Sequence, residues 1–315
     1  MIRSRRKFIN HSITSLSTMA LSRYIGRYLN TESEIEKLDV SIFSKHLQFL
    51  NYKETGHIAQ ELGFDGVDLT VRPKGHVLPQ HVTKDLPRAI KDIKAAGSDC
   101  KMMTTNIESV ANPLDVDIIE SAGQVGISYY RTNWYKYIEG ISMVQSLQQF
   151  QNQIYELGLL NQKHNIIGCY QNHAGTKIGA THWEIHKLLE KVDPKYFGTQ
   201  YDIRHATVDS GYSWTNGLKL LHESIKVIVL KDFKWGKVNN QWKAINVPIG
   251  EGMVDFISYF KLLKAYGLNP PVSLHLEYPL GGAEKGKYEI SVDREVVYHA
   301  MTKDLKAIQQ LWKEA

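Results

Sequence analysis

The feature that most constrains the fold is an alternation of short apolar segments with longer amphipathic ones, which begins at residue 38 and continues almost to residue 315. Runs rich in β-branched and aromatic residues predict strands. They cover residues 38–43, 66–71, 101–106, 128–132, 165–171, 198–202, 226–231 and 272–277. Helical periodicity is clearest over residues 54–62, 85–96, 142–163, 181–191, 254–267 and 292–314. This repeated strand–helix unit predicts an α/β fold.

Two α/β architectures share this alternation, the closed (β/α)8 TIM barrel and the open doubly wound sheet. An open sheet that binds nucleotides carries a glycine-rich or Walker loop after a strand, and none follows a predicted strand here. The repeated units and the length of 315 residues instead fit one barrel of about 250 residues. We therefore expect a single (β/α)8 barrel domain over residues 31–315.

The net charge of +5 comes from the N-terminus. Residues 1–30 hold six Arg and Lys and no acidic residue, which leaves 32 basic against 33 acidic residues in the rest of the chain. Binding to nucleic acid through a broad cationic face needs clustered Lys and Arg. The near-neutral body therefore argues against a nucleic-acid partner.

The basic N-terminal segment resembles a twin-arginine export signal. Arg5 and Arg6 are followed by Phe8 and then by the weakly apolar residues 11–22. We expect residues 1–30 to be this signal and the protein to be periplasmic; a solvated basic tail is the alternative. No later run approaches the roughly 18 apolar residues of a spanning helix, so we expect no stable membrane insertion.

Several predicted strands end in polar residues that can bind a metal or move a proton. Gln171, Asp202 and Glu277 each stand at such an end. Parallel barrel strands carry functional side chains at their C-terminal ends, so these residues are expected to meet in one site. Lys231 joins them, because the alternation that begins at Val227 turns it inward. The layout is typical of an enzyme.

The order and spacing of these segments resemble the xylose isomerase-like TIM barrels, a family of sugar isomerases, ketose 3-epimerases and inosose dehydratases. Asp202-Ile203-Arg204-His205 is similar to the family's Asp-x-x-His, and Lys231-Asp232 to its Lys-Asp after strand seven. Residues 170–176 resemble its strand-five motif, and residues 247–256 its glycine-rich turn. Glu277 falls where the family places a metal-binding Glu.

The resemblance implies a divalent metal ion, either Mn, Mg, Zn or Co. Its ligands would be Asp202, Glu277, Gln171 and His275, the last because residues two apart on a strand share a face. Asp202 can alternatively cap the following helix, and an inward His is often a core residue. The implied catalytic residues are Glu277, His205 and Lys231.

The resemblance also implies a small-molecule carbohydrate substrate, and a homo-oligomer is compatible with it. Trp and Arg side chains suit sugar rings and hydroxyls, although both also pack loops. The candidate substrate-binding residues are Arg72, His76, Arg131, Trp134, His173 and Arg204.

Two departures from the family pattern widen the functional alternatives. Val229 stands where metal-binding relatives commonly carry His, and Gln171 where the epimerases carry Glu. The first expectation is a metal-dependent isomerase or epimerase that removes a proton next to a sugar carbonyl. The second expectation is a lyase that acts by β-elimination on a keto-sugar or 3-keto-glycoside, with His205 as the acid. It follows from Gln171, which removes one of the two opposed carboxylates that an epimerase needs. A non-catalytic carbohydrate-binding barrel is the third, and the three-zinc endonuclease branch is disfavoured.

Overall fold

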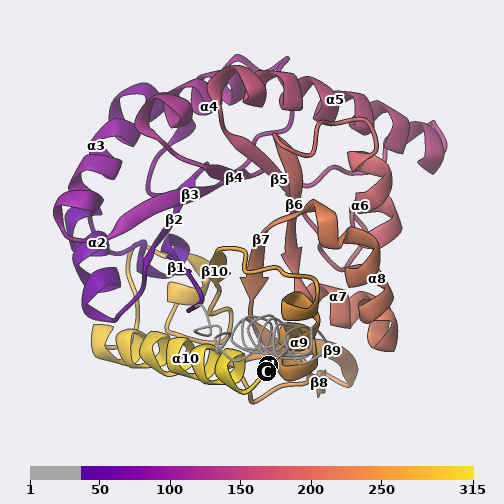
Figure 1. Ribbon diagram of the computed structural model, residues 1–315. Coiled ribbons are helices and arrows are strands. Elements are labelled where there is room, and N and C mark those ends of the chain that lie inside the picture. The colour runs from indigo at the N-terminus through magenta and orange to yellow at the C-terminus, as the bar shows by residue number, and fades with distance from the viewer. Residues whose placement is uncertain (1–36) are drawn as a thin grey trace, which may run out of the picture. The chain divides into compact units, whose positions relative to one another are not determined.

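The computed structural model describes residues 37–315, so the predicted export signal over residues 1–30 lies outside the described residues. Parallel strands close into a barrel in the order β1-β2-β3-β4-β5-β6-β7-β10, with β10 pairing back onto β1 (Figure 1). This confirms the expected TIM barrel. The strands are β1 (Val40–Phe43), β2 (Gly66–Val71), β3 (Asp99–Thr105), β4 (Tyr129–Arg131), β5 (Ile167–Gln171), β6 (Phe197–Asp202), β7 (Ile225–Leu230) and β10 (Val272–Leu274).

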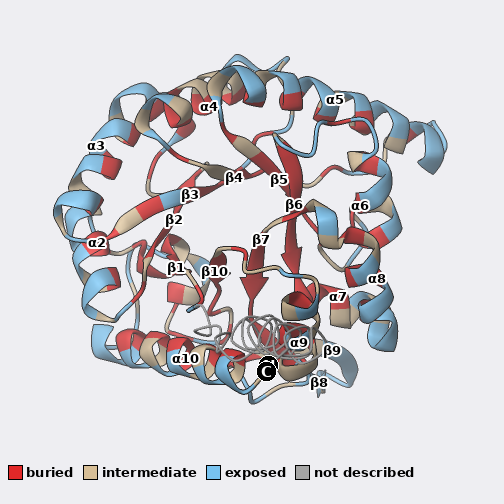
Figure 2. Ribbon diagram, in the orientation of Figure 1, coloured by how far each residue is buried: buried red, intermediate tan, exposed pale blue. Residues whose placement is uncertain are grey.

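Helices form a ring outside the barrel (Figure 1). They are α2 (Tyr52–Glu61), α3 (Val82–Ala95), α4 (Pro113–Val125), α5 (Met143–His164), α6 (His182–Leu189), α7 (Ile203–Ser210), α8 (Trp214–Leu221), α9 (Phe256–Ala265) and α10 (Arg294–Glu314). Each turns a buried stripe toward the strands and an exposed stripe outward, as Figure 2 shows. The apolar core therefore lies between the two layers.

Local sequence explains where the elements begin and end. The strands β1, β2 and β6 are buried along their whole length, which is expected where helices cover the outside of a parallel sheet and side chains fill its interior. Asn51, Ser142 and Thr181 each accept a backbone N–H in a capping box and so begin α2, α5 and α6. Asn165 ends α5 with a positive φ of 52°, a conformation that Asn tolerates.

An antiparallel hairpin, β8 (Asp232–Val238) and β9 (Gln241–Val247), follows β7 and was not predicted from the sequence. Its base is tied down by Asp232, which accepts N–H groups from Phe233, Gly250, Gly252 and Val254 at 2.8–3.2 Å. The predicted strand over residues 272–277 is also shorter, since β10 ends at Leu274. His275 and Glu277 therefore stand on irregular backbone just beyond the strand.

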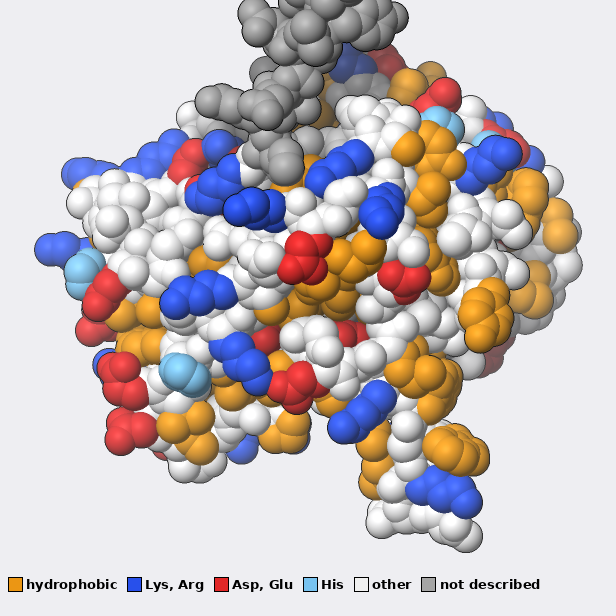
Figure 3. All heavy atoms as spheres, turned by 60° about the horizontal axis from the view of Figure 1, so that its bottom comes forward, with side chains coloured by type: hydrophobic (Ala, Val, Ile, Leu, Met, Phe, Trp, Pro, Cys, Tyr) orange, Lys and Arg blue, Asp and Glu red, His pale blue; other side chains and the backbone are white. Residues whose placement is uncertain are grey.

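Charges are mixed on the molecular surface. On the face in Figure 3, basic and acidic side chains are interspersed rather than gathered into a field of one sign. Within residues 37–315 no helix is both long and apolar enough to span a bilayer.

Candidate functional site

Asp202, the last residue of β6, has two roles. Its Oδ1 accepts the backbone N–H of His205 at 3.0 Å and so caps α7. Its Oδ2 accepts the amide N–H of Gln171 at 2.8 Å and lies 3.1 Å from Lys231 Nζ. Burial raises the pKa of this fully buried carboxyl, whereas Lys231 and the N–H of His205 favour its ionised form. Asp202 is thus a helix cap that also holds the site's lysine.

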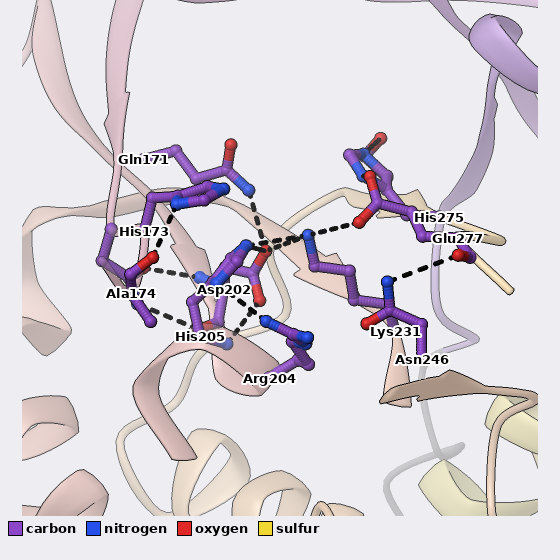
Figure 4. Close-up of polar contacts among 12 residues, drawn as sticks. Gln171, His173, Ala174, Asp202, Arg204, His205, Lys231, Asn246, His275 and Glu277 are labelled. Atoms are coloured by element: carbon purple, nitrogen blue, oxygen red, sulfur yellow. Dashed lines mark hydrogen bonds and ion pairs between the residues drawn. The ribbon is translucent and has the colours of Figure 1, made fainter. Parts of the chain in front are cut away.

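Lys231 is the centre of the cluster, as Figure 4 shows. Its Nζ lies 3.1 Å from Asp202 Oδ2, 3.3 Å from Glu277 Oε2 and 3.0 Å from His205 Nε2, and the side chain is only 4% exposed. An ammonium has three N–H donors, so these three acceptors use all of them. The Lys231 side chain is therefore fixed in place.

Glu277 accepts hydrogen bonds from two lysines. Lys45 Nζ donates to its Oε1 at 2.9 Å, and Lys231 donates to its Oε2. Burial opposes ionisation, but the two ammoniums outweigh it and hold the pKa of Glu277 well below its usual range. Its side chain remains 26% exposed, so a carboxylate stays accessible at the mouth of the barrel.

His205 lies beside the lysine and not in the open. Its Nε2 faces Lys231, its Nδ1 lies 3.2 Å from Arg204 Nη1, and its ring packs 3.8 Å from that of His173. Burial, together with Lys231, His173 and Arg204, lowers the pKa of His205 well below its usual value. The imidazole is therefore neutral, and its surroundings disfavour the protonated form.

A second hydrogen-bonded chain runs from His275 into the barrel. His275 Nε2 lies 3.0 Å from Ser273 Oγ, which donates to Asp68 Oδ2 at 2.6 Å, and Thr104 donates to the same carboxyl. Burial lowers the pKa of His275 to about 3 and raises that of Asp68 to about 6. His275 points inward as expected, but its partner is Ser273; its Nδ1 stays 3.9 Å from Glu277 Oε1.

A cavity opens beside this cluster. It encloses about 60 Å³, and about 330 Å³ when the space at its open mouth is included. Its lining residues are Phe43, Lys45, Arg72, Thr104, Arg131, Trp134, Gln171, His173, Lys231, His275 and Glu277. The Arg131 guanidinium lies 4.2 Å from the Trp134 ring and that of Arg72 5.4 Å from the Phe43 ring. Cations and aromatic faces therefore dominate the walls.

Eight of the twelve residues expected from the sequence line this cavity, and Asp202 and His205 contact Lys231 beside it, which leaves His76 and Arg204. The His76 ring turns away beneath its loop toward Ser44 Oγ and Thr70 Oγ1, at 3.1 and 3.3 Å. Arg204 lies over Phe233 and donates to a backbone carbonyl of β9. Neither lines the cavity, so their expected contact with substrate is not supported.

Sequence reasoning missed Phe43, Lys45 and Thr104. Lys45 comes two residues after β1 ends, and a cation directly after a barrel strand is a signal that could have identified it. Its partner Glu277 is 232 residues away in the chain, and no local pattern links the two.

The fold and the matching family model together decide the family. Residues 57–294 match the model described as "Xylose isomerase-like TIM barrel". This chain belongs to that family. No curated protein sequence matches it.

Solved structures with this fold include several xylose isomerase-like TIM barrels. D-psicose 3-epimerase from Clostridium cellulolyticum H10 has a TM-score of 0.65 at 12% identity, covering 87% of this chain and 99% of that one. The 3-keto-D-glucoside 4-epimerase from E. coli has a TM-score of 0.62 at 12% identity, with 84% and 98% covered. A Mycobacterium smegmatis protein in complex with magnesium also has 0.62, at 11% identity, with 88% and 99% covered. At these identities the likeness is one of fold.

Because one such relative binds magnesium, the expected ligands can be tested for fit. The position between Asp202 and Glu277 holds the Lys231 ammonium, Gln171 turns its amide N–H toward Asp202, and His275 is bonded to Ser273. Within residues 37–315 no group of three or more His, Cys, Asp or Glu side chains is arranged to hold a metal ion. The residues as arranged do not fit a divalent ion.

Proposed function

We propose that this protein is an isomerase- or epimerase-like enzyme that removes a proton from the carbon next to a carbohydrate carbonyl. The observation that carries the proposal is Glu277, a carboxylate held ionised at the cavity wall with the Lys231 ammonium 3.3 Å away. A base beside a fixed cation is the pair that enolisation of a carbonyl compound needs. The family's sugar epimerases support the substrate class.

The proposed step uses the chain's own residues. Glu277 takes the proton, the C–H electron pair forms the enediolate double bond, and the carbonyl oxygen becomes an oxyanion beside Lys231. Return of the proton to the neighbouring carbon, with the hydroxyl proton moving to the oxyanion, gives isomerisation. His205 accepts an N–H from Lys231 and so helps to hold the ammonium in place beside the cavity. Trp134 and Arg131 offer a stacking face and hydrogen-bond donors to the sugar.

One observation favours a second candidate, a lyase. Among the described residues that line the cavity, Glu277 is the one carboxylate, so no second carboxylate base stands on an opposite face. Inversion of a carbon needs a proton acceptor on one face and a proton donor on the other, whereas β-elimination from a keto-sugar or 3-keto-glycoside starts with a single proton abstraction. Release of an aglycone from a 3-keto-glycoside would identify the lyase.

Exchange of substrate C–H with solvent deuterium tests the shared first step. We expect exchange in a ketose or keto-glycoside with the wild type, and a rate about 10² to 10⁴ lower in Glu277→Gln, which keeps the side chain's shape but not its basicity. Glu289→Gln, at an exposed position, is the control and should match the wild type. No exchange across a broad panel of sugars would favour the non-catalytic sugar-binding barrel.

We propose export from the sequence alone. Arg5 and Arg6, which lie outside the described residues, are the pair that a twin-arginine signal requires. Replacing both with Lys should leave the protein in the cytoplasm, as measured by cell fractionation. Unchanged periplasmic delivery would rule out this route.

A further inference from the structure

The Lys231 ammonium stands where two carboxylates from different strands converge. Asp202 ends β6 and Glu277 follows β10, and the nitrogen lies 3.1 and 3.3 Å from their nearest oxygens (Figure 4). At 4% exposure the side chain is enclosed by protein. The cation between these carboxylates is therefore part of the polypeptide.

The formal charges of the cluster balance without a further cation. Two ammoniums, Lys45 and Lys231, face two carboxylates, Asp202 and Glu277, so the cluster is neutral as it stands. A divalent ion would add two positive charges to a largely desolvated cluster that already has Arg72 and Arg131 in the adjoining wall. Uncompensated charge in such surroundings is unfavourable.

The polar groups of the neighbouring side chains mostly face other partners. Gln171 presents its N–H to Asp202, and His275 presents Nε2 to Ser273. Val229 pairs with Asp202 across β6 and β7 and has no donor atom. His275 Nδ1 has no hydrogen-bond partner and lies 3.9 Å from Glu277 Oε1, but both carboxylates that would complete a site with it are already bound by Lys231.

We propose that Lys231 replaces the divalent ion of this site and that its fixed positive charge at the cavity wall, without a metal and without a hydrogen bond to the substrate, stabilises the oxyanion. The oxyanion-stabilising half of this inference rests on the proposed function; the replacement of the ion does not. An ammonium fixed by Asp202, Glu277 and His205 is preorganised toward the cavity, so little reorganisation accompanies the appearance of negative charge.

Metal binding tests the replacement without any knowledge of the substrate. Wild type, Lys231→Ala and Lys45→Ala are expressed with Mn, Mg, Zn and Co supplements, purified without chelator, analysed for bound metal, and melted in increasing concentrations of each ion. We expect no stoichiometric metal and no ion-dependent rise in melting temperature for the wild type. Lys231→Ala, which empties the position, should bind an ion at least about tenfold more tightly than wild type and melt higher with it.

Lys45→Ala is the matched control, because it removes an ammonium from Glu277 but leaves Lys231 between the carboxylates. It should gain no ion. If Lys231→Ala does not fold, Lys231→Gln takes its place in the same measurements. A wild type that carries one ion per chain overturns the proposal, and so does a folded Lys231 variant that gains none. Absence of sugar turnover would count against the proposed function and leave these binding results intact.

Discussion

At the scale of single residues, the site depends on side chains that each satisfy several partners. Asp202 caps α7, accepts from Gln171 and pairs with Lys231. The capping role, which sequence reasoning weighed against a functional one, coexists with it because a carboxylate has two oxygens and the two roles use different ones. Substitutions can therefore separate the charge of Asp202 from its cap.

Asp202→Asn should keep the cap and lose the charge. Asn caps helices as well as Asp, but its neutral amide leaves the buried Lys231 with Glu277 as its nearest anion. Breaking a buried pair by removing one partner costs about 3–5 kcal/mol of stability. Urea unfolding should show a loss of this size. Asp255→Asn is the matched control, because exposed Asp255 caps α9 in the same way, and its change should stay within about 0.5 kcal/mol.

At the scale of elements, the β8–β9 hairpin and the turn after it depend on one carboxylate. Asp232 gathers four backbone N–H groups, two of them from Gly250 and Gly252 in the turn that precedes α9. The hairpin in turn reaches the site, since Asn246 of β9 donates to the Glu277 carbonyl. The Lys-Asp and glycine-turn motifs noted in the sequence thus form one structural unit.

Gly252→Ala should disrupt this unit. A Cβ at residue 252 would stand 2.1 Å from Asp232 Oδ1 and 2.4 Å from the Phe233 carbonyl oxygen, and backbone and a fully bonded carboxylate cannot easily move. Overpacking of this kind costs typically about 1–3 kcal/mol. Thermal or urea unfolding would measure it. Glu251→Ala, the exposed neighbour, should be near neutral even though it removes a surface pair with Lys303; equal losses would contradict the steric account.

At the scale of the whole molecule, the sequence was sufficient for the barrel but only partly for the site. Strand–helix alternation is a local signal, and the observed barrel strands coincide with the predicted ones to within three residues at either end, whereas the β8–β9 hairpin was not predicted. The Lys45–Glu277 pair was not predictable because it forms only when the barrel closes. The direction of the His76 ring, toward the hydroxyls of Ser44 and Thr70, was not predictable because periodicity carries no information on it.

The histidines give the whole molecule a predictable acid response. Burial lowers the pKa of His76 and His182 to about 4, and it also lowers the pKa values of His46, His173, His205 and His275. The unfolded chain takes up these protons near pH 6.5, the folded chain only near pH 4 or below. Between those values the unfolded state binds more protons, so stability falls as pH falls. Burial raises the pKa values of six carboxyls, which act oppositely and offset part of this loss; they are Asp68 and Asp304, both raised to about 6, and Asp115, Glu184, Asp202 and Asp232.

His182→Gln should isolate one share of this loss. His182 is 4% exposed and is stacked on Tyr201, away from the cavity, with its Nε2 unbonded. A pKa lowered from 6.5 to about 4 corresponds to roughly 3 kcal/mol of stability lost between pH 7 and pH 4. As pH falls across that range, the free energy of unfolding of the variant, measured in urea, should therefore rise relative to that of the wild type by up to this amount. His186 is exposed on the same helix α6, so the stability of His186→Gln should change with pH in the same way as that of the wild type. If the stability of both variants follows pH as the wild type does, His182 has the same pKa in the folded and unfolded chains.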